Sequence, residues 1–157
     1  MNYNRFPILA ALIVLTLLSA TAYAAPPDDE SALRNTSVAI RAAFAKGDVA
    51  EAMKYHHPEV KKALAFHKVL VGRDAVAADL TNTLRQYHLE FVENNVESLL
   101  IHDSTAVEQT LFTIRGTPVS GGESFLFKGR AMVVYVRYKE SPTGWASIRE
   151  IIQPATD

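Results

Sequence analysis

LEFVENNVESLLIHDSTAVEQTLFTIR, residues 89–115, is the stretch of sequence that decides the fold. Apolar and polar residues tend to alternate along it, and it is rich in the β-branched and aromatic residues that favour strands. His-Asp-Ser at residues 102–104 interrupts the alternation with residues typical of a tight turn. The stretch therefore predicts two antiparallel strands, residues 89–101 and 105–115, joined as a hairpin.

Two further segments follow the same two-residue period, residues 125–138 and 145–153. Ser-Pro-Thr-Gly at residues 141–144 separates them and is typical of a turn. Residues 63–71 form one more apolar run and predict an additional strand earlier in the chain. The second half of the sequence therefore predicts a long, mainly antiparallel meander.

The first half of the sequence instead has helical periodicity. Apolar residues recur at helical spacing within residues 31–46, and Gly47 follows where a glycine commonly ends a helix. A second, short helix is expected to begin at Asp48 and to end at Pro58, and residues 74–87 predict a third. Because the helices precede the strands, we predict an α+β fold with the helices on the concave face of a curved sheet.

Residues 1–24 have the three parts of a secretory signal peptide: a basic start, an apolar run over residues 6–18 and small residues at the end. The apolar run is shorter than the roughly 20 residues that a bilayer-spanning helix needs. We therefore expect cleavage after Ala24, a periplasmic or secreted location, and no membrane attachment afterwards. Residues 25–30 contain two prolines and are expected to be a flexible segment before a single domain, residues 31–154.

Composition and charge make several classes of site improbable. The formal net charge is −1 and the sixteen basic residues are scattered, whereas nucleic-acid binding needs a concentrated positive patch. The chain has no cysteine, so it has neither a disulfide framework nor a zinc–thiolate site. The five histidines include no pair at helical metal-ligand spacing. We therefore expect no nucleic acid, metal or cofactor.

Four short motifs, taken in their order and spacing, resemble those of a known superfamily. They are Ala45-Lys46-Gly47-Asp48, Tyr55-His56-His57-Pro58, Gly72-Arg73-Asp74-Ala75-Val76 and Gly144-Trp145-Ala146-Ser147-Ile148-Arg149. The chain resembles the NTF2-like superfamily, and within it the SnoaL-like and DUF4440-type domains, which are similar to ketosteroid isomerase. The resemblance implies a conical α+β fold with a deep, largely apolar pocket, commonly in homodimers.

The residues that carry ketosteroid isomerisation in that family are not found at the matching positions. The family's oxyanion tyrosine falls at Ile40, its general base near Ala63 and its second oxyanion acid near Val134. Enolate chemistry needs both a base and hydrogen-bond donors for the oxyanion. The resemblance therefore does not extend to this reaction, and no catalytic residue is assigned.

Strand alternation then suggests which side chains line the pocket. If Val134 faces inward, so do Arg130 and Tyr138 on the same strand. Gln109, together with Leu111 and Thr113, and Glu150, together with Ile148 and Ile152, are expected to face inward on neighbouring strands. The candidate ligand-binding residues are His56, His67, Gln109, Arg130, Tyr138 and Glu150.

Some of these residues also have a purely structural interpretation. His56 can satisfy the last carbonyls of a helix, and Arg130 and Glu150 can neutralise each other at the rim of the pocket. His67 lies in an apolar segment, where a histidine is a poor choice for packing alone.

Three functions remain open from the sequence. The first is an exported domain that binds a small hydrophobic molecule. The second is a small-molecule enzyme of the isomerase, dehydratase or hydrolase type, in which His67 works with Glu150 or Tyr138. The third is a dimeric assembly domain that associates through an outer sheet face carrying Tyr135 and Trp145.

Overall fold

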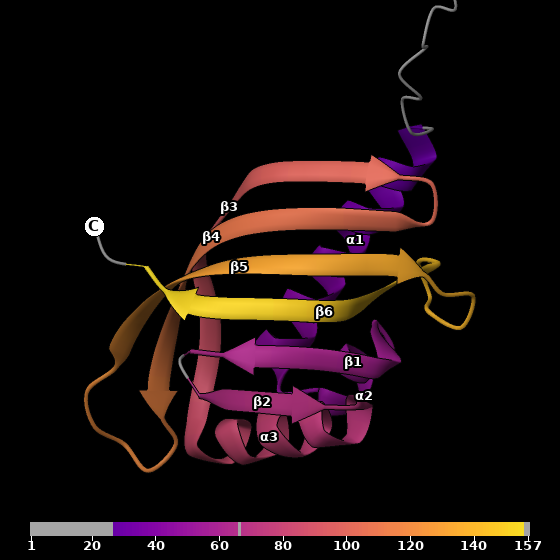
Figure 1. The fold of residues 1–157 in the computed structure, drawn as a ribbon. Helices are drawn as coiled ribbons and strands as arrows, with labels where there is room; N and C mark the ends of the chain where they lie inside the picture. Colours follow the sequence, from indigo (N-terminus) through magenta and orange to yellow (C-terminus); the bar gives the residue numbers. More distant parts are fainter. Residues whose placement is uncertain (1–26, 66, 156–157) are drawn as a thin grey trace, which may run out of the picture.

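The computed structural model describes residues 27–65 and 67–155, which form three helices and a six-stranded sheet (Figure 1). In chain order the elements are α1 (Pro27–Lys46), α2 (Val49–Met53), β1 (His56–Leu64), β2 (Lys68–Val71), α3 (Arg73–Gln86), β3 (Tyr87–His102), β4 (Thr105–Pro118), β5 (Phe125–Arg137) and β6 (Trp145–Pro154). The four strands predicted in the second half of the chain are therefore present.

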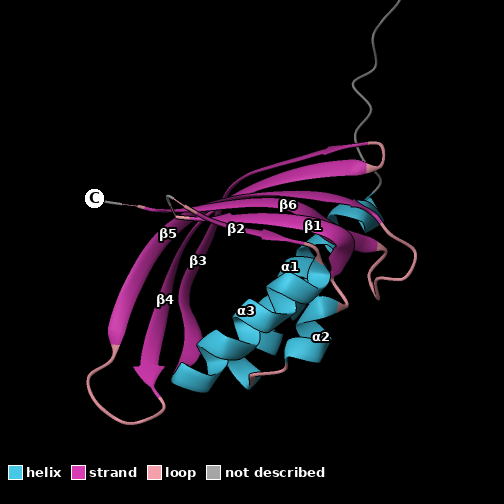
Figure 2. Ribbon diagram, turned by 60° about the horizontal axis from the view of Figure 1, so that its bottom comes forward, coloured by secondary structure: helices cyan, strands magenta, loops and turns pink. Residues whose placement is uncertain are grey.

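The strands are arranged in the order β2-β1-β6-β5-β4-β3, and only the β1–β6 pair is parallel. The sheet curves, and the three helices lie on its concave side (Figure 2). The predicted α+β fold, with helices on the concave face of a mainly antiparallel sheet, is confirmed.

The first helix begins earlier than expected. The first turn of α1 contains three acidic residues, Asp28, Asp29 and Glu30. Their negative charges interact favourably with the positive end of the helix dipole. Residues 27–30, predicted to be flexible, are therefore helical, whereas the predicted signal peptide, residues 1–24, lies outside the described residues. No helix in the described part of the chain is both long and apolar enough to cross a membrane.

The region around Pro58 differs from the prediction in two respects: the second helix ends earlier than expected, and Pro58 lies in a strand. The second helix begins as expected, because the Asp48 side chain accepts a hydrogen bond from the backbone N–H of Glu51 at 2.9 Å, but it already ends at Met53. Pro58 lies within β1, where the pairing with β6 shifts between His56 and Lys61. Proline is tolerated at such an irregularity because it has no N–H to donate to the ladder.

The predicted strand 63–71 is in fact the end of one strand, a turn and a second strand. Ala65, with φ 53°, lies in that turn, and β1 and β2 pair antiparallel on either side of it.

Two apolar clusters hold the helices against the sheet. One joins Leu33 of α1 to buried residues of β4, β5 and β6, including Phe112 and Trp145. The other joins α1, α2 and α3 to Val60 of β1, with Leu80 among its members. The space between the two clusters is the region from which the functional site is built.

Candidate functional site

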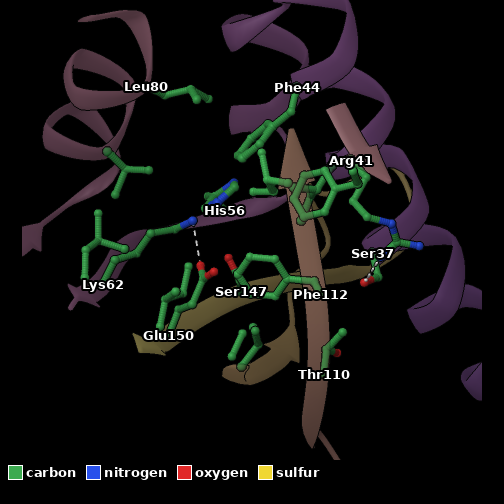
Figure 3. A pocket seen from close by; sticks show the side chains of 18 of the residues that line it. Ser37, Arg41, Phe44, His56, Lys62, Leu80, Thr110, Phe112, Ser147 and Glu150 are labelled. Carbon is green, nitrogen blue, oxygen red and sulfur yellow. Dashed lines mark hydrogen bonds and ion pairs between the residues drawn. The ribbon is translucent and has the colours of Figure 1, made fainter. Parts of the chain in front are cut away.

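A cavity of about 210 Å³ lies between the concave face of the sheet and helices α1 and α3 (Figure 3). Its apolar lining consists of Ile40, Phe44, Leu64, Leu70, Val76, Leu80, Phe91, Phe112, Ile114, Ala131, Val133 and Ile152. Its polar lining consists of Ser37, Arg41, His56, Lys62, Asp79, Thr83, Asn94, Glu108, Thr110, Tyr135, Ser147 and Glu150. The cavity therefore combines apolar walls with several polar groups.

The register of the strands arranges four of these residues in one row across the sheet. Lys62 pairs with Glu150, Glu150 with Val133, and Val133 with Glu108. Because neighbouring strands lie about 4.8 Å apart, the Cα atoms of the two glutamates are separated by about 10 Å. An apolar side chain, Val133, therefore lies between two carboxylates on the floor of the cavity.

A buried ion pair forms one end of this row. Nζ of Lys62 lies 2.6 Å from Oε2 of Glu150, and the two side chains are only 8% and 13% exposed. Figure 3 shows the two side chains pointing toward each other, with a dashed line marking the ion pair. An ammonium group has three donors, so Lys62 retains donors beyond the one directed at Glu150.

His56 lies beside this ion pair as a neutral imidazole. Its burial, and secondarily the positive charge of Lys62, lower its pKa to about 3. Nδ1 lies 2.8 Å from the backbone carbonyl oxygen of Ala52, and a carbonyl can only accept, so Nδ1 carries the hydrogen. Nε2 of His56 is consequently the acceptor nitrogen of the ring.

Ser147 reaches the cavity because β6 contains a bulge. Tyr135 pairs with Ser147 and Val134 with Arg149, which leaves Ile148 as an extra residue. Ser147 and Glu150 therefore both face the cavity although they are three residues apart. Oγ of Ser147 is buried and has no hydrogen-bond partner within residues 27–65 and 67–155.

A second polar cluster surrounds Glu108 at the other end of the row. Its Oε1 accepts hydrogen bonds from Ser37 at 3.0 Å and from Thr110 at 3.3 Å. Arg41 donates to the Ser37 hydroxyl at 2.9 Å, so a positive charge lies one side chain away from the carboxylate. Oε2 of Glu108 is buried and, in the described part of the chain, has no partner.

Tyr135 contributes a neutral phenol to the same wall. Burial, and then the nearby charge of Glu108, raise the pKa of Tyr135. The phenol therefore stays protonated and serves as a hydrogen-bonding group without a charge.

Of the six predicted site residues, the structure places His56 and Glu150 in the cavity and the other four elsewhere. His67 is exposed in the turn between β1 and β2, because the predicted continuous strand is interrupted there. Tyr138 lies just beyond the end of β5, where its hydroxyl donates to Glu140. The inward orientation predicted for His67 and Tyr138 is wrong.

Gln109 and Arg130 are on the convex face instead of the concave one. Both side chains donate to Glu97, Gln109 at 2.8 Å and Arg130 through two bonds of 2.8 Å. The predicted orientation was wrong by one residue on β4 and on β5, since Glu108 and Val133 face the cavity in place of Gln109 and Val134. Leu111, Thr113 and Ile148 are likewise absent from the cavity lining.

The prediction that Tyr135 and Trp145 lie on the outer face of the sheet is also wrong. Their exposures are 2% and 0%, and both belong to the apolar cluster beneath the sheet. Tyr135 is two residues from Val133 on β5, so it faces the same, concave side of the sheet.

Several functional candidates were missed by the sequence reasoning. They are Ser37, Arg41, Lys62, Glu108, Tyr135 and Ser147. The sequence held one usable signal for Glu108: if Phe112 is assigned to the core, a two-residue period places Thr110 and Glu108 on the same face. The bulge that brings Ser147 inward has no such signal, because neither glycine nor proline marks it.

No group of three or more His, Asp or Glu side chains in the described ranges could hold a metal ion.

Comparison with known proteins finds likenesses among solved structures. No protein-family model and no curated protein sequence matches the chain. A conserved protein of Planctomyces limnophilus has 22% identity and a TM-score of 0.72, over 81% of this chain and 98% of that one. A ketosteroid isomerase-like protein of Erwinia carotovora atroseptica has 10% identity and a TM-score of 0.70, over 84% and 100%.

A third similar structure is a candidate dehydratase of the NTF2-like family from Streptomyces avermitilis. It has 17% identity and a TM-score of 0.72, and the match covers 84% of this chain and 100% of that one. At such low identities the likeness concerns the course of the backbone, and the chemistry has to be argued from this chain's own residues.

Proposed function

The chain has an NTF2-like fold, and on that premise we propose that it binds a small, mainly apolar ring compound between its sheet and its helices. The observation that carries the proposal is the cavity, in which apolar walls enclose polar groups that the protein itself leaves without partners. Binding sites for small molecules combine these two features, since apolar walls supply affinity and a few polar groups fix orientation.

The size of the cavity limits the size of the ligand. An engineered apolar cavity of about 150 Å³ in another protein binds benzene. A volume of about 210 Å³ therefore suits one ring with one or two small substituents.

The test uses 4-fluoroacetophenone as a probe and 19F NMR as the readout. Ala131 faces the cavity, so Ala131→Leu fills it, whereas Val134→Leu introduces the same side chain on the outside of the same strand. We expect the wild-type protein to broaden and shift the probe signal, Ala131→Leu to weaken binding about tenfold or more, and Val134→Leu to bind as the wild type does. Absence of binding, or equal binding by all three proteins, would refute the proposal.

A proton-transfer enzyme is the second candidate. The imidazole of His56 and the carboxylate of Glu150 both line the cavity, and these two types of side chain are common proton-transfer groups in enzymes. This candidate replaces His67, which is exposed, with His56. The test is a panel of small ketones, esters, epoxides and alcohols. We expect the wild-type protein to turn over at least one of them and His56→Gln to lose that turnover. No turnover of any compound would refute the enzyme function.

The protein is proposed to act outside the cytoplasm, after removal of residues 1–24. The support for this is the signal-peptide pattern of that segment. Intact mass measurement of the protein recovered from the periplasm or medium should show a chain beginning at Ala25, and recovery of the uncleaved chain from the cytoplasm would contradict export.

Homodimerisation through the convex face is proposed as the state in which the protein binds its ligand. Strand register places Val69, Ala63, Ile151 and Met132 in one row on this face, and the three larger side chains are exposed. Exposed apolar side chains that form a continuous patch commonly mark an interface. Ile151→Lys should convert a dimer into a folded monomer by light scattering, and a monomeric wild-type protein would refute the proposal.

A further inference from the structure

We infer that the cavity recognises a neutral ring compound with a hydroxyl donor at one edge, bound by Glu108, and a carbonyl oxygen at the opposite edge, bound by Ser147 and Lys62. The inference rests on the proposed function, because it specifies the ligand of the same cavity. It is carried by the unequal hydrogen bonding of Glu108 on one side of the cavity and of Lys62 and Ser147 on the other.

The Glu108 end accepts hydrogen bonds and cannot donate them when the carboxylate is ionised. Two hydroxyls already bind Oε1, from Ser37 and Thr110, whereas Oε2 is buried without a partner in the described ranges. Glu108 is only 3% exposed, so bulk water does not compensate Oε2. A buried acceptor left in this way is destabilising, and a ligand hydroxyl that donates to it removes the penalty.

The opposite side of the cavity, at Lys62 and Ser147, has hydrogen-bond donors that are not used among the described residues. The Lys62 ammonium uses one donor on Glu150 and retains others, and the Ser147 hydroxyl has no partner in the described part of the chain. Both side chains line the cavity. A carbonyl oxygen, which accepts two hydrogen bonds, fits this end better than a second hydroxyl does.

The spacing between the two ends suits a single ring. Glu108 and Glu150 are two strands apart, with Val133 between them in the row and Ala131 on the same face of β5. Lys62, which donates at the other end, lies one strand beyond Glu150, so the Cα atoms of Glu108 and Lys62 are three strand spacings or about 14 Å apart, and the side chains shorten this distance from both ends. A ring lying over Val133 and Ala131 would therefore direct para substituents at the two polar ends.

The charges in the cavity favour a neutral ligand. Lys62 and Glu150 form an ion pair, and Glu108 has the positive charge of Arg41 one hydroxyl away. A ligand carboxylate would face Glu108 or Glu150 across a poorly hydrated space, and like charges there repel strongly.

The experiment compares three probes that differ only in their polar substituents. 4-Hydroxyacetophenone carries both groups, 4-fluoroacetophenone lacks the hydroxyl donor, and 4-ethylphenol lacks the carbonyl. Dissociation constants are measured by 19F NMR, directly for the fluorinated ketone and by competition for the other two. We expect the wild-type protein to bind 4-hydroxyacetophenone about tenfold more tightly than either of the other compounds, since a hydrogen bond to a charged group is stronger than one between neutral groups.

Two substitutions test the hydroxyl-binding and carbonyl-binding groups separately. Glu108→Gln should reduce the affinity for both hydroxyl compounds about tenfold and leave 4-fluoroacetophenone unchanged, whereas Glu97→Gln, the same substitution on the convex face, should change none of the three. Ser147→Ala should reduce the affinity for both ketones about fivefold and leave 4-ethylphenol unchanged.

Failure of this inference is distinguishable from failure of the proposed function. If 4-fluoroacetophenone binds and Ala131→Leu abolishes its binding, the cavity is a ligand site. In that case an unchanged affinity of Glu108→Gln for 4-hydroxyacetophenone overturns the inference and leaves the proposed function standing. If no ketone binds the wild-type protein, both are refuted.

Discussion

Each face of the sheet holds a hydrogen-bonded glutamate, Glu97 on the convex face and Glu108 on the concave one, and their hydrogen bonding differs. On the convex face both oxygens of Glu97 are bonded, to Arg130 and Gln109. Those hydrogen bonds, chiefly from Arg130, lower the pKa of Glu97 to about 2. On the concave face, Glu108 has one bonded oxygen and one buried oxygen without a partner in the described residues.

If the concave face binds the ligand as proposed, completeness of hydrogen bonding, more than the presence of polar residues, distinguishes it from the convex face. A complete network such as that of Glu97 needs nothing further and can serve folding alone. An incomplete network in a buried place leaves an energetic penalty that a ligand can remove.

The largest effect is expected from Lys62→Met on the concave face. The substitution leaves the Glu150 carboxylate buried without its partner, and breaking a buried ion pair in this way costs about 3–5 kcal/mol of unfolding free energy. Urea denaturation of the variant and the wild type measures the difference.

The matched control for this prediction removes both charges. Lys62→Met combined with Glu150→Leu should regain most of the lost stability, because no unpaired charge remains. A single variant as stable as the wild type would mean that the pair is hydrated and not part of a buried site.

The second prediction concerns pH and His56. Its pKa is about 3 in the folded protein and about 6.5 when unfolded, so below pH 6.5 the unfolded chain binds a proton that the folded chain does not. Stability should therefore fall as pH is lowered from about 6.5 toward 3, with a contribution from this residue that approaches about 1.4 kcal/mol per pH unit.

The dependence is measured by urea denaturation between pH 7 and pH 5, above the range in which most carboxylates titrate. His56→Gln should flatten the slope by up to one proton, while His67→Gln, a substitution in the exposed turn, should retain it. An unchanged slope in His56→Gln would show that this imidazole is not buried in neutral form.

The smallest effect is expected from Arg130→Met on the convex face. Ion pairs that are open to solvent contribute little to stability, so the unfolding free energy should stay close to that of the wild type. The pKa of Glu97, followed by carboxyl-carbon NMR, should rise from about 2 because Arg130 is the main cause of its depression. Affinity for the three probes should stay the same, and a loss of binding would contradict the assignment of this network to the structural face.

The order of helices and strands could be predicted from the sequence because periodicity is a local property. The four late strands and the helix starting near Asp48 are examples. The choice of face was not predictable in the same way, because residues 131–136 are apolar on both sides of the strand and alternation alone does not say which side is inside.

Irregularities of the ladder explain the remaining errors at the site. The bulge at Ile148 replaces that residue with Ser147 in the cavity, and the shift near Pro58 allows a strand to begin at His56 where a helix was expected. Both depend on pairing between strands far apart in the sequence. Lys62 and Glu150 meet only because β1 lies parallel to β6, a contact that no local pattern indicates.

Binding of a ring compound on the concave face is tested most directly by an isotope-filtered NOE experiment on the wild-type protein with bound 4-hydroxyacetophenone. Side chains on β5 alternate between the two faces, so the methyl groups that contact the ring identify the face that binds it. We expect NOEs from the ring protons to the methyl groups of Ala131 and Val133, which line the cavity. NOEs to Met132 and Val134 instead would place the ligand on the convex face and refute binding in the cavity.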